Sequence, residues 1–356
     1  MRASGQRARH GLARNHEHQG RGMKLRRSKV VAVLSLMLTA AALAAAPAAL
    51  ANIVIGEIAY SVKTGIYEIR ANGTDLHELI PWRTATCGAS CVVWDVPRHP
   101  HFSPNGKLLT YDMETNIVHG DVGKVEEDTR AVYVADANGR DRRRLGLGYS
   151  PNFTSSGNIV YSLNPNMWSQ KLLLEERPEP FEEDFAPLEE VNVSSGVSQK
   201  LPVPGSAEYS SNGSLMLFSH QVKESTGFHT VTTVENTNGT EPRSTFLPRF
   251  YDEPVHFTTS GEVSYECPAP GDQHPDICLY NPTTGKHRVL RSGSSSYWPL
   301  EAANSPSGQL YAVACLQGLF VTNAQGQDAH EIVKNGSGPD YVQSDIPTSP
   351  VWLPAP

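Results

Sequence analysis

The sequence predicts an all-β fold: a six-bladed β-propeller of four-stranded antiparallel blades, with the ring closed by the C-terminal strand. Three observations predict it. A motif ending in a glycine turn recurs along the chain, a strand–turn–strand unit alternates with it, and the two chain ends supply complementary parts of one blade. One four-stranded sheet cannot bury both of its faces, whereas sheets stacked in a ring can.

The first repeat is an aromatic residue four positions before a turn glycine, followed by a short apolar run. Its clearest copy is PHFSPNGKLLTYD at 100–112, where Phe102 precedes Gly106. Asn-Gly or Ser-Gly between apolar runs is typical of a tight turn between strands. Looser copies stand at 151–162, 207–219, 255–266 and 302–314, the last with Asn304 in the aromatic position.

The second repeat has apolar residues on both sides of a glycine-containing turn, as in AVYVADANGRDRRRLG at 131–146. Alternating apolar residues around such a turn indicate a β-hairpin. Six copies occur, with turn glycines at 73, 139, 196, 239, 285 and 326. That spacing is typical of propeller blades, so each blade pairs one copy of each repeat.

The chain ends predict how the ring closes. Residues 53–80 form a unit of three strands that lacks the aromatic strand, and TSPVWLPAP at 348–356 offers that strand around Trp352 without a following hairpin. Pairing the two completes the first blade and removes free sheet edges. A β-sandwich or a β-helix would explain the strands but not these complementary ends.

This pattern resembles the TolB-like (WD40-like) six-bladed propeller family, whose repeat reads approximately aromatic-SPDG-strand, then IYVMNADGS-strand-RRLT. The segments HFSPNGKLLTYD and VYVADANGRDRRRLG are the nearest copies, and the resemblance covers nearly all of 53–354. It implies the fold, but no particular activity, because scaffolds, peptidase gating domains and polysaccharide lyases share such repeats. TolB itself carries an α/β domain before its propeller, and we expect none here.

The N-terminal segment is predicted to direct export. Basic residues at 24–29 precede an apolar stretch from Val30 to about Leu43, and Ala49-Leu50-Ala51 fits a cleavage site. We therefore expect a disordered upstream extension at 1–22, a signal peptide at 23–51 and one propeller domain at 52–356, in the periplasm or secreted. A membrane anchor is disfavoured because the apolar run is short and rich in alanine.

Charge limits the classes of partner. Residues 1–51 hold nine of the 30 Lys and Arg residues and one of the 37 acidic residues, which leaves 52–356 with a formal net charge of −15. An acidic body disfavours nucleic acid and anionic membrane surfaces and suits a cationic partner. We expect a monomer that binds a protein or a cell-envelope component.

The cysteines indicate disulfides. Cys87 and Cys91 lie four residues apart in an expected loop, and Cys267 and Cys278 flank another. Each pair can close a small loop in an oxidising compartment, whereas neither has the paired spacing of a zinc site. Cys315, within LYAVACL, is predicted to be a small buried hydrophobic residue.

The loops predict which face of the ring functions. Turns that join the first strand of a blade to the second, and the third to the fourth, are short. The other connections are long: 81–98, 113–129, 164–187, 267–278 and 335–349. We call the face that carries the long connections the long-loop face and the opposite one the tight-turn face. Function on a rigid scaffold usually lies in elaborated loops.

Candidate binding residues lie in these long loops or where the chain enters each innermost strand at the channel mouth. The 164–187 segment, with six acidic residues between 175 and 184, is either an acidic contact for a basic partner or a solvated loop. The candidate set is Trp94, Asp95, His99, Tyr149, Trp168, Asp252, Glu253, His274, Trp298 and Asp345.

Three histidines are the best candidates for metal ligands. His99, His101 and His256 lie at or in innermost strands, but they lack close ligand spacing. His101 and His256 share one repeat position, which we expect to face a neighbouring blade. We predict no metal and no cofactor.

Sequence motifs for catalysis are missing: the chain has no G-x-S-x-G, no H-E-x-x-H and no glycine-rich phosphate loop. The prediction is a non-catalytic binding scaffold that uses its long-loop face. The alternative is a carbohydrate-binding protein or a lyase-like enzyme acting at the channel mouth.

Overall fold

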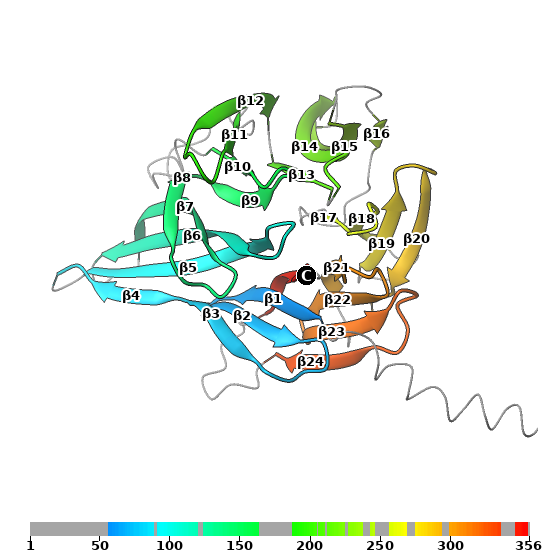
Figure 1. The fold of residues 1–356 in the computed structure, drawn as a ribbon, viewed down its shortest axis with the longest axis horizontal. Coiled ribbons are helices and arrows are strands. Elements are labelled where there is room, and N and C mark those ends of the chain that lie inside the picture. The colour runs from blue at the N-terminus through cyan, green and yellow to red at the C-terminus, as the bar shows by residue number, and fades with distance from the viewer. Residues whose placement is uncertain are drawn as a thin grey trace, which may run out of the picture. The chain divides into compact units, whose positions relative to one another are not determined.

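The strands form six antiparallel sheets arranged around a common axis, the blades of a β-propeller (Figure 1). The computed structural model describes residues 56–354 except 89–90, 120–123, 164–186, 205, 211, 225–226, 238–242, 246–255, 269–274, 294–298 and 336–345. All described strands belong to one compact unit, Ile55–Pro356. The predicted signal peptide and upstream extension lie outside the described residues.

In each blade the strands are ordered from the axis outward. Blade 1 contains β25 (Thr348–Trp352), β1 (Glu57–Val62), β2 (Gly65–Arg70) and β3 (His77–Pro81). Blade 2 contains β5 (Cys91–Phe102), β6 (Leu108–His119), β7 (Lys124–Asp136) and β8 (Arg143–Leu147), with β4 (Arg83–Thr86) beside β5. Blade 3 contains β9 (Tyr149–Phe153), β10 (Ile159–Ser162), β11 (Pro187–Val191) and β12 (Ser198–Pro204).

The other three blades follow the same order. Blade 4 contains β13 (Ser206–Tyr209), β14 (Leu215–Glu224), β15 (Gly227–Asn236) and β16 (Arg243–Thr245). Blade 5 contains β17 (His256–Phe257), β18 (Val263–Cys267), β19 (Asp276–Asn281) and β20 (Lys286–Arg291). Blade 6 contains β21 (Pro299–Asn304), β22 (Leu310–Cys315), β23 (Gly318–Asn323) and β24 (His330–Lys334).

The predicted ring closure is confirmed. β25 pairs antiparallel with β1, with Trp352 opposite Ile58 and Val351 opposite Ala59. The Trp352 indole N–H also donates to the carbonyl of Ala303 in blade 6, 2.9 Å away. The C-terminal strand therefore joins the first blade to the last.

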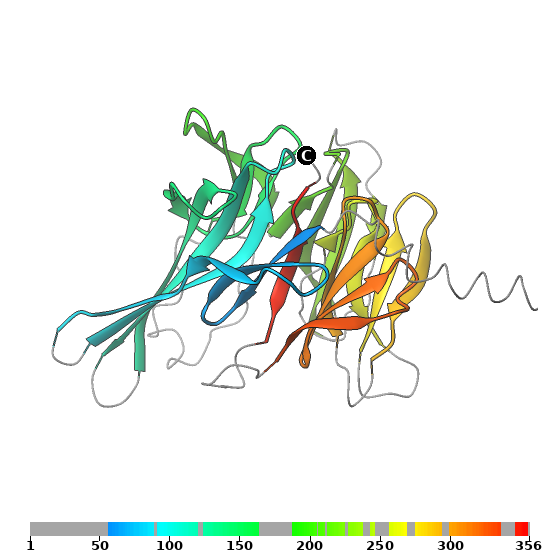
Figure 2. The same cartoon turned by 60° about the horizontal axis from the view of Figure 1, so that its bottom comes forward.

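Blade 2 differs from the expected four strands because it has five. Segments expected to be loops, 81–98 and most of 113–129, instead form β4, the first half of β5 and the distal parts of β6 and β7. Figures 1 and 2 show β4–β7 extending beyond the other sheets. The elaboration is on the long-loop face, as predicted, but it is an ordered sheet and not a loop.

The aromatic-Ser-x-x-Gly repeat recurs because one buried hydroxyl closes each tight turn. Ser103 accepts the Leu108 N–H at 2.9 Å, and its carbonyl accepts the Gly106 N–H at 2.8 Å. The same buried hydroxyl stands in the other four copies, at Thr154, Ser210, Thr258 and Ser305. A buried hydroxyl paired in this way satisfies a backbone donor that no strand reaches.

The Asn-Gly-x-Asp sequence in the turn between the third and fourth strands of a blade follows from the backbone conformation of that turn. In blade 2, Gly139 has φ 75° and Asp141 has φ 51°, both in the left-handed region. Glycine takes that region without steric cost, and aspartate tolerates it better than most residues. The same pair of left-handed residues occurs in blades 1 and 6.

The apolar core is divided among the contacts between neighbouring blades. One cluster joins blades 1 and 2 and contains Ile66, Leu79, Phe102 and Tyr111. Another joins blades 5 and 6 and contains Ile277 and Tyr311. The repeat aromatics Phe153 and Phe257 occupy the corresponding clusters of blades 2–3 and 4–5. Burying such a side chain contributes about 1.5–3 kcal/mol, so each blade is stabilised by its neighbours.

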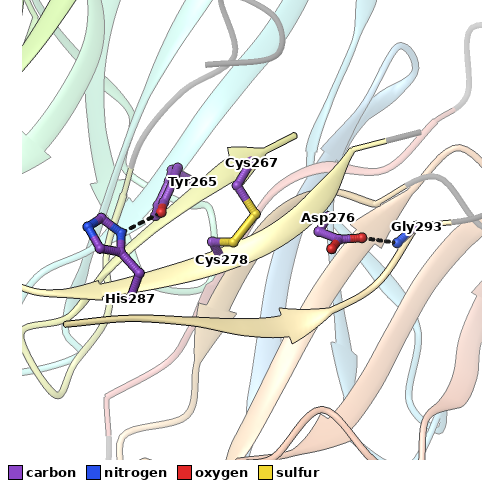
Figure 3. The surroundings of a disulfide bond; sticks show 6 residues. All are labelled: Tyr265, Cys267, Asp276, Cys278, His287 and Gly293. Carbon is purple, nitrogen blue, oxygen red and sulfur yellow. Dashed lines mark hydrogen bonds between the residues drawn. A yellow bond between two sulfur atoms is a disulfide. The ribbon is translucent and has the colours of Figure 1, made fainter. Parts of the chain in front are cut away.

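Both predicted disulfides are present, and Cys315 is buried, as predicted. Cys267 and Cys278 join β18 to β19 with a Cα–Cα distance of 5.8 Å. Around this bond, Tyr265 contacts His287 and the Asp276 carboxylate accepts the Gly293 N–H (Figure 3).

Among the described residues, no helix is long and apolar enough to cross a membrane.

Candidate functional site

The innermost strands carry a recurring β-bulge that positions side chains near the ring axis. Three residues there have positive φ: His99 at 49°, Ser150 at 49° and Ser349 at 50°. Each precedes a proline and coincides with a shift in strand register. A residue before proline normally prefers extended backbone, so the fold imposes this conformation. At this position blade 2 has the imidazole of His99, whereas blades 1 and 3 have the hydroxyls of Ser349 and Ser150.

His99 is oriented by a buried carboxylate. Its Nδ1 lies 2.7 Å from Oδ1 of Asp112 on β6, and Asp112 is 0% exposed. The other oxygen, Oδ2, has no hydrogen-bond partner among the described residues. An ionised carboxylate only accepts hydrogen bonds, so Nδ1 carries the proton and a neutral His99 ring presents Nε2 as an acceptor.

A second pair of the same kind lies between blades 4 and 5. Nδ1 of His256 is 2.9 Å from Oε2 of Glu208, whose Oε1 accepts the Phe257 N–H at 2.9 Å. Both side chains are partly exposed. Glu208 therefore fixes the His256 ring and the backbone of β17 together.

His101 brings opposite blades together. The centroid of its imidazole lies 6.3 Å from that of His256. The two residues belong to blades 2 and 5, which face each other across the propeller axis. The expectation that this repeat position faces a neighbouring blade is correct for the contact of His256 with Glu208 and wrong for His101. Burial, with the nearby His256 and His99, lowers the pKa of His101 from its ordinary 6.5 to about 3.

The projecting part of blade 2 carries two exposed tryptophans. Trp94 on β5 is 39% exposed, and Trp82, just before β4, is 40% exposed. Trp94 is the register partner of Thr84, which lies two residues after Trp82, so both tryptophans stand at the β4–β5 hairpin. Cys87 and Cys91 close the hairpin with a disulfide. We call these residues the tryptophan hairpin.

Polar contacts stiffen this part of blade 2. Asp95, a predicted site residue, accepts the hydroxyl of Thr115 at 2.7 Å, so it links β5 to β6. Glu114 lies 2.7 Å from Arg98 and 3.2 Å from Arg130. Burial alone would raise the pKa of Glu114, but the two arginines and an Asn116 amide lower it below its ordinary value.

The remaining predicted site residues divide into two groups. Tyr149 is half-buried at the start of β9, opposite Ser162. Six lie outside the described residues: Trp168, Asp252, Glu253, His274, Trp298 and Asp345. In the described part of the chain, no group of three or more His, Cys, Asp and Glu side chains is arranged to hold a metal ion.

Sequence reasoning missed Asp112, Glu208 and Trp82. Glu208 shares the repeat position of His101 and His256, and this register could have revealed it. No sequence pattern indicated Asp112, because its hydrogen bond to His99 depends on the bulge in β5. Trp82 follows Pro81 in a segment expected to be a loop.

Comparison with known proteins shows the fold alone. No protein-family profile and no curated protein sequence matches this chain. Its structure is similar to TolB from Acinetobacter baumannii, with a TM-score of 0.56 and 13% identity, covering 84% of this chain and 67% of that one. It is also similar to the tricorn protease, with a TM-score of 0.54 and 12% identity, covering 81% of this chain and 26% of that one. The chain has a TolB-like β-propeller fold.

Proposed function

We propose that this protein is an exported, non-catalytic binding scaffold that recognises a protein or a cell-envelope component through its long-loop face. One observation carries the proposal: the tryptophan hairpin presents two indole rings, 40% and 39% exposed, on the projecting part of blade 2. Exposed tryptophans on a rigid support are typical centres of binding energy in protein interfaces.

The asymmetry of the two faces supports this choice of surface. The tight-turn face has short turns closed by buried hydroxyls, whereas the extended strands of blade 2 project on the long-loop face. Both disulfides also lie toward the long-loop face, one closing the tryptophan hairpin and one joining β18 to β19. Ordered strands and disulfides reduce the entropy lost on binding.

Charge and disulfides support the environment and the type of partner. Residues 52–356 have a formal net charge of −15, which favours association with a cationic surface. Two disulfides fit an oxidising compartment such as the periplasm or the extracellular space.

Alanine variants on the two faces test the proposal. Immobilised wild-type protein, the double variant Trp82→Ala/Trp94→Ala and the control Val197→Ala are incubated with the exported proteins of the host, and bound partners are quantified. Val197 is a fair control because it is 68% exposed in the β11–β12 turn of the tight-turn face. We expect at least tenfold loss of bound partner in the tryptophan variant alone. Equal retention by both variants, or loss only with Val197→Ala, would overturn the proposal.

A further inference from the structure

Acidic side chains from three blades contact residues of the innermost strands, which lie nearest the ring axis. Asp112 of β6, Glu208 of β13 and Glu301 of β21 are mostly or fully withdrawn from solvent. Glu301 accepts the backbone N–H of Ser349, and the other two accept imidazole N–H groups. None of these three carboxylates has an Arg or Lys partner among the described residues.

The imidazole of His101 does not balance this charge at neutral pH. His101 has a pKa of about 3, so its ring is neutral at pH 7. The one arginine in the described part of the innermost strands, Arg98, is 2.7 Å from Glu114. Buried carboxylates without a positive partner are unfavourable, so this cluster favours an added cation.

A second observation points to a ligand at the same place. Asp112 is 0% exposed, and its Oδ2 has no hydrogen-bond partner in the part of the chain that the structure describes. Its Oδ1 holds His99, whose side chain is 28% exposed and within reach of a ligand from solvent. A cationic N–H group beside His99 would stabilise the Asp112 charge and donate a hydrogen bond to Nε2 of the imidazole.

We propose that the axial cluster of His99, Asp112, Glu208 and His256 receives one cationic side chain, a lysine ammonium or arginine guanidinium, of the partner. The inference rests on the proposed function, because the cation belongs to the protein that the scaffold binds. An organic cation is favoured over a metal ion because the described acidic and imidazole groups do not form a metal-binding set. The contact adds to the tryptophan hairpin and does not use it.

A peptide titration of the full chain tests the proposal. The probes are acetyl-Gly-Lys-Gly-amide, its norleucine analogue with the same length but no charge, and its glutamate analogue. Histidine ring signals are followed by NMR at pH 7.5 and low salt. We expect the lysine peptide to shift the His99 and His256 signals saturably, and the other two peptides to have no such effect.

Charge-matched variants locate the site. Asp112→Asn and Glu208→Gln are each expected to weaken binding of the lysine peptide at least tenfold. Glu331→Gln, which removes one exposed acid on β24, is expected to leave it unchanged. Circular dichroism checks folding, and if Asp112→Asn does not fold, Glu208→Gln decides the matter.

Three outcomes would overturn the proposal. They are an equal response to the norleucine peptide, binding that survives both axial substitutions, and a response of the ring signals to zinc chloride without one to the lysine peptide. Trp94→Ala is expected to bind the lysine peptide normally. Loss of peptide binding in Trp94→Ala would place the cation at the hairpin, which contradicts the axial site but leaves the proposed function standing.

Discussion

The imidazole rings of His101 and His256 lie 6.3 Å apart, although the two residues belong to opposite blades and are separated by more than 150 positions in the sequence. The ring of six blades places blades 2 and 5 opposite each other, and this contact spans its axis. Burial of His101, together with the nearby imidazoles of His256 and His99, disfavours its protonation.

Acid should therefore destabilise the protein partly through His101. The pKa of this imidazole is 6.5 ordinarily and about 3 in the folded protein, so the unfolded chain binds the proton first. Stability is then lost as the pH falls from about 6.5 toward 3, by up to ~1.4 kcal/mol per pH unit for one proton. Urea unfolding between pH 7 and pH 4 should show a shallower pH dependence for His101→Gln. An unchanged slope in that variant would exclude His101 as the cause.

Glu68 should have the opposite effect on stability. Burial and the neighbouring Glu57 raise the pKa of Glu68 from 4.5 to about 7, against the opposing effect of His77. The folded state thus holds a proton that the unfolded chain releases, and stability is lost as the pH rises from about 4.5 through 7.

The variant Glu68→Gln should match wild type near pH 4 and be more stable at pH 8, by roughly 1–3 kcal/mol. Urea unfolding at the two pH values measures this difference. Glu331→Gln, an exposed change on β24, is the control and should show no such dependence. A Glu68→Gln variant that is less stable than wild type at pH 8 would contradict the assignment.

Gly326 should tolerate alanine much less well than Gly285. Both are turn glycines with positive φ, 73° and 68°, so either substitution costs about 1–2 kcal/mol in backbone strain. A Cβ on Gly326 would also overlap the Leu290 carbonyl oxygen in blade 5, whereas one on Gly285 meets nothing within 4 Å.

The clash should add a further ~1–3 kcal/mol of destabilisation to Gly326→Ala, because the contact between blades 5 and 6 must shift. Urea unfolding of both variants with the disulfides intact measures the difference. Equal losses in the two variants would mean that this turn does not pack against the preceding blade.

The Cys267–Cys278 disulfide should contribute about 2–3 kcal/mol to the free energy of unfolding. The bond closes a loop with a sequence separation of 11, and both half-cystines are buried between β18 and β19. Unfolding of Cys267→Ser/Cys278→Ser measures the contribution. The pair Cys87→Ser/Cys91→Ser opens a shorter loop, with a separation of 4, and should lose less. The reverse order would contradict this account.

The fold could be predicted because its signals are local and repeated. The buried hydroxyl of Ser103 and the left-handed Gly139 each fix a turn within a few residues, and each recurs in other blades. The position of Trp352 was predictable for a related reason, because one strand was missing at one end of the chain and one was unpaired at the other.

Much of the candidate site depends on non-local geometry and could not be predicted. Asp112 matters because the bulge at His99 turns that imidazole toward it, and the following Pro100 favours an extended residue 99. In residues 81–98, Pro97 and the cysteine pair interrupt the strand pattern and locally indicate a loop. Pairing with β6 overrides those local signals.

The contact between His101 and His256 is the most direct test of the closed ring. Nuclear Overhauser spectroscopy of histidine-labelled protein, with His101→Gln and His256→Gln used to assign the signals, measures whether the two rings are neighbours. We expect a cross-peak between them that disappears in either variant. Two assigned ring signals with no cross-peak in the folded wild-type protein would contradict the six-bladed closure and the axial site built on it.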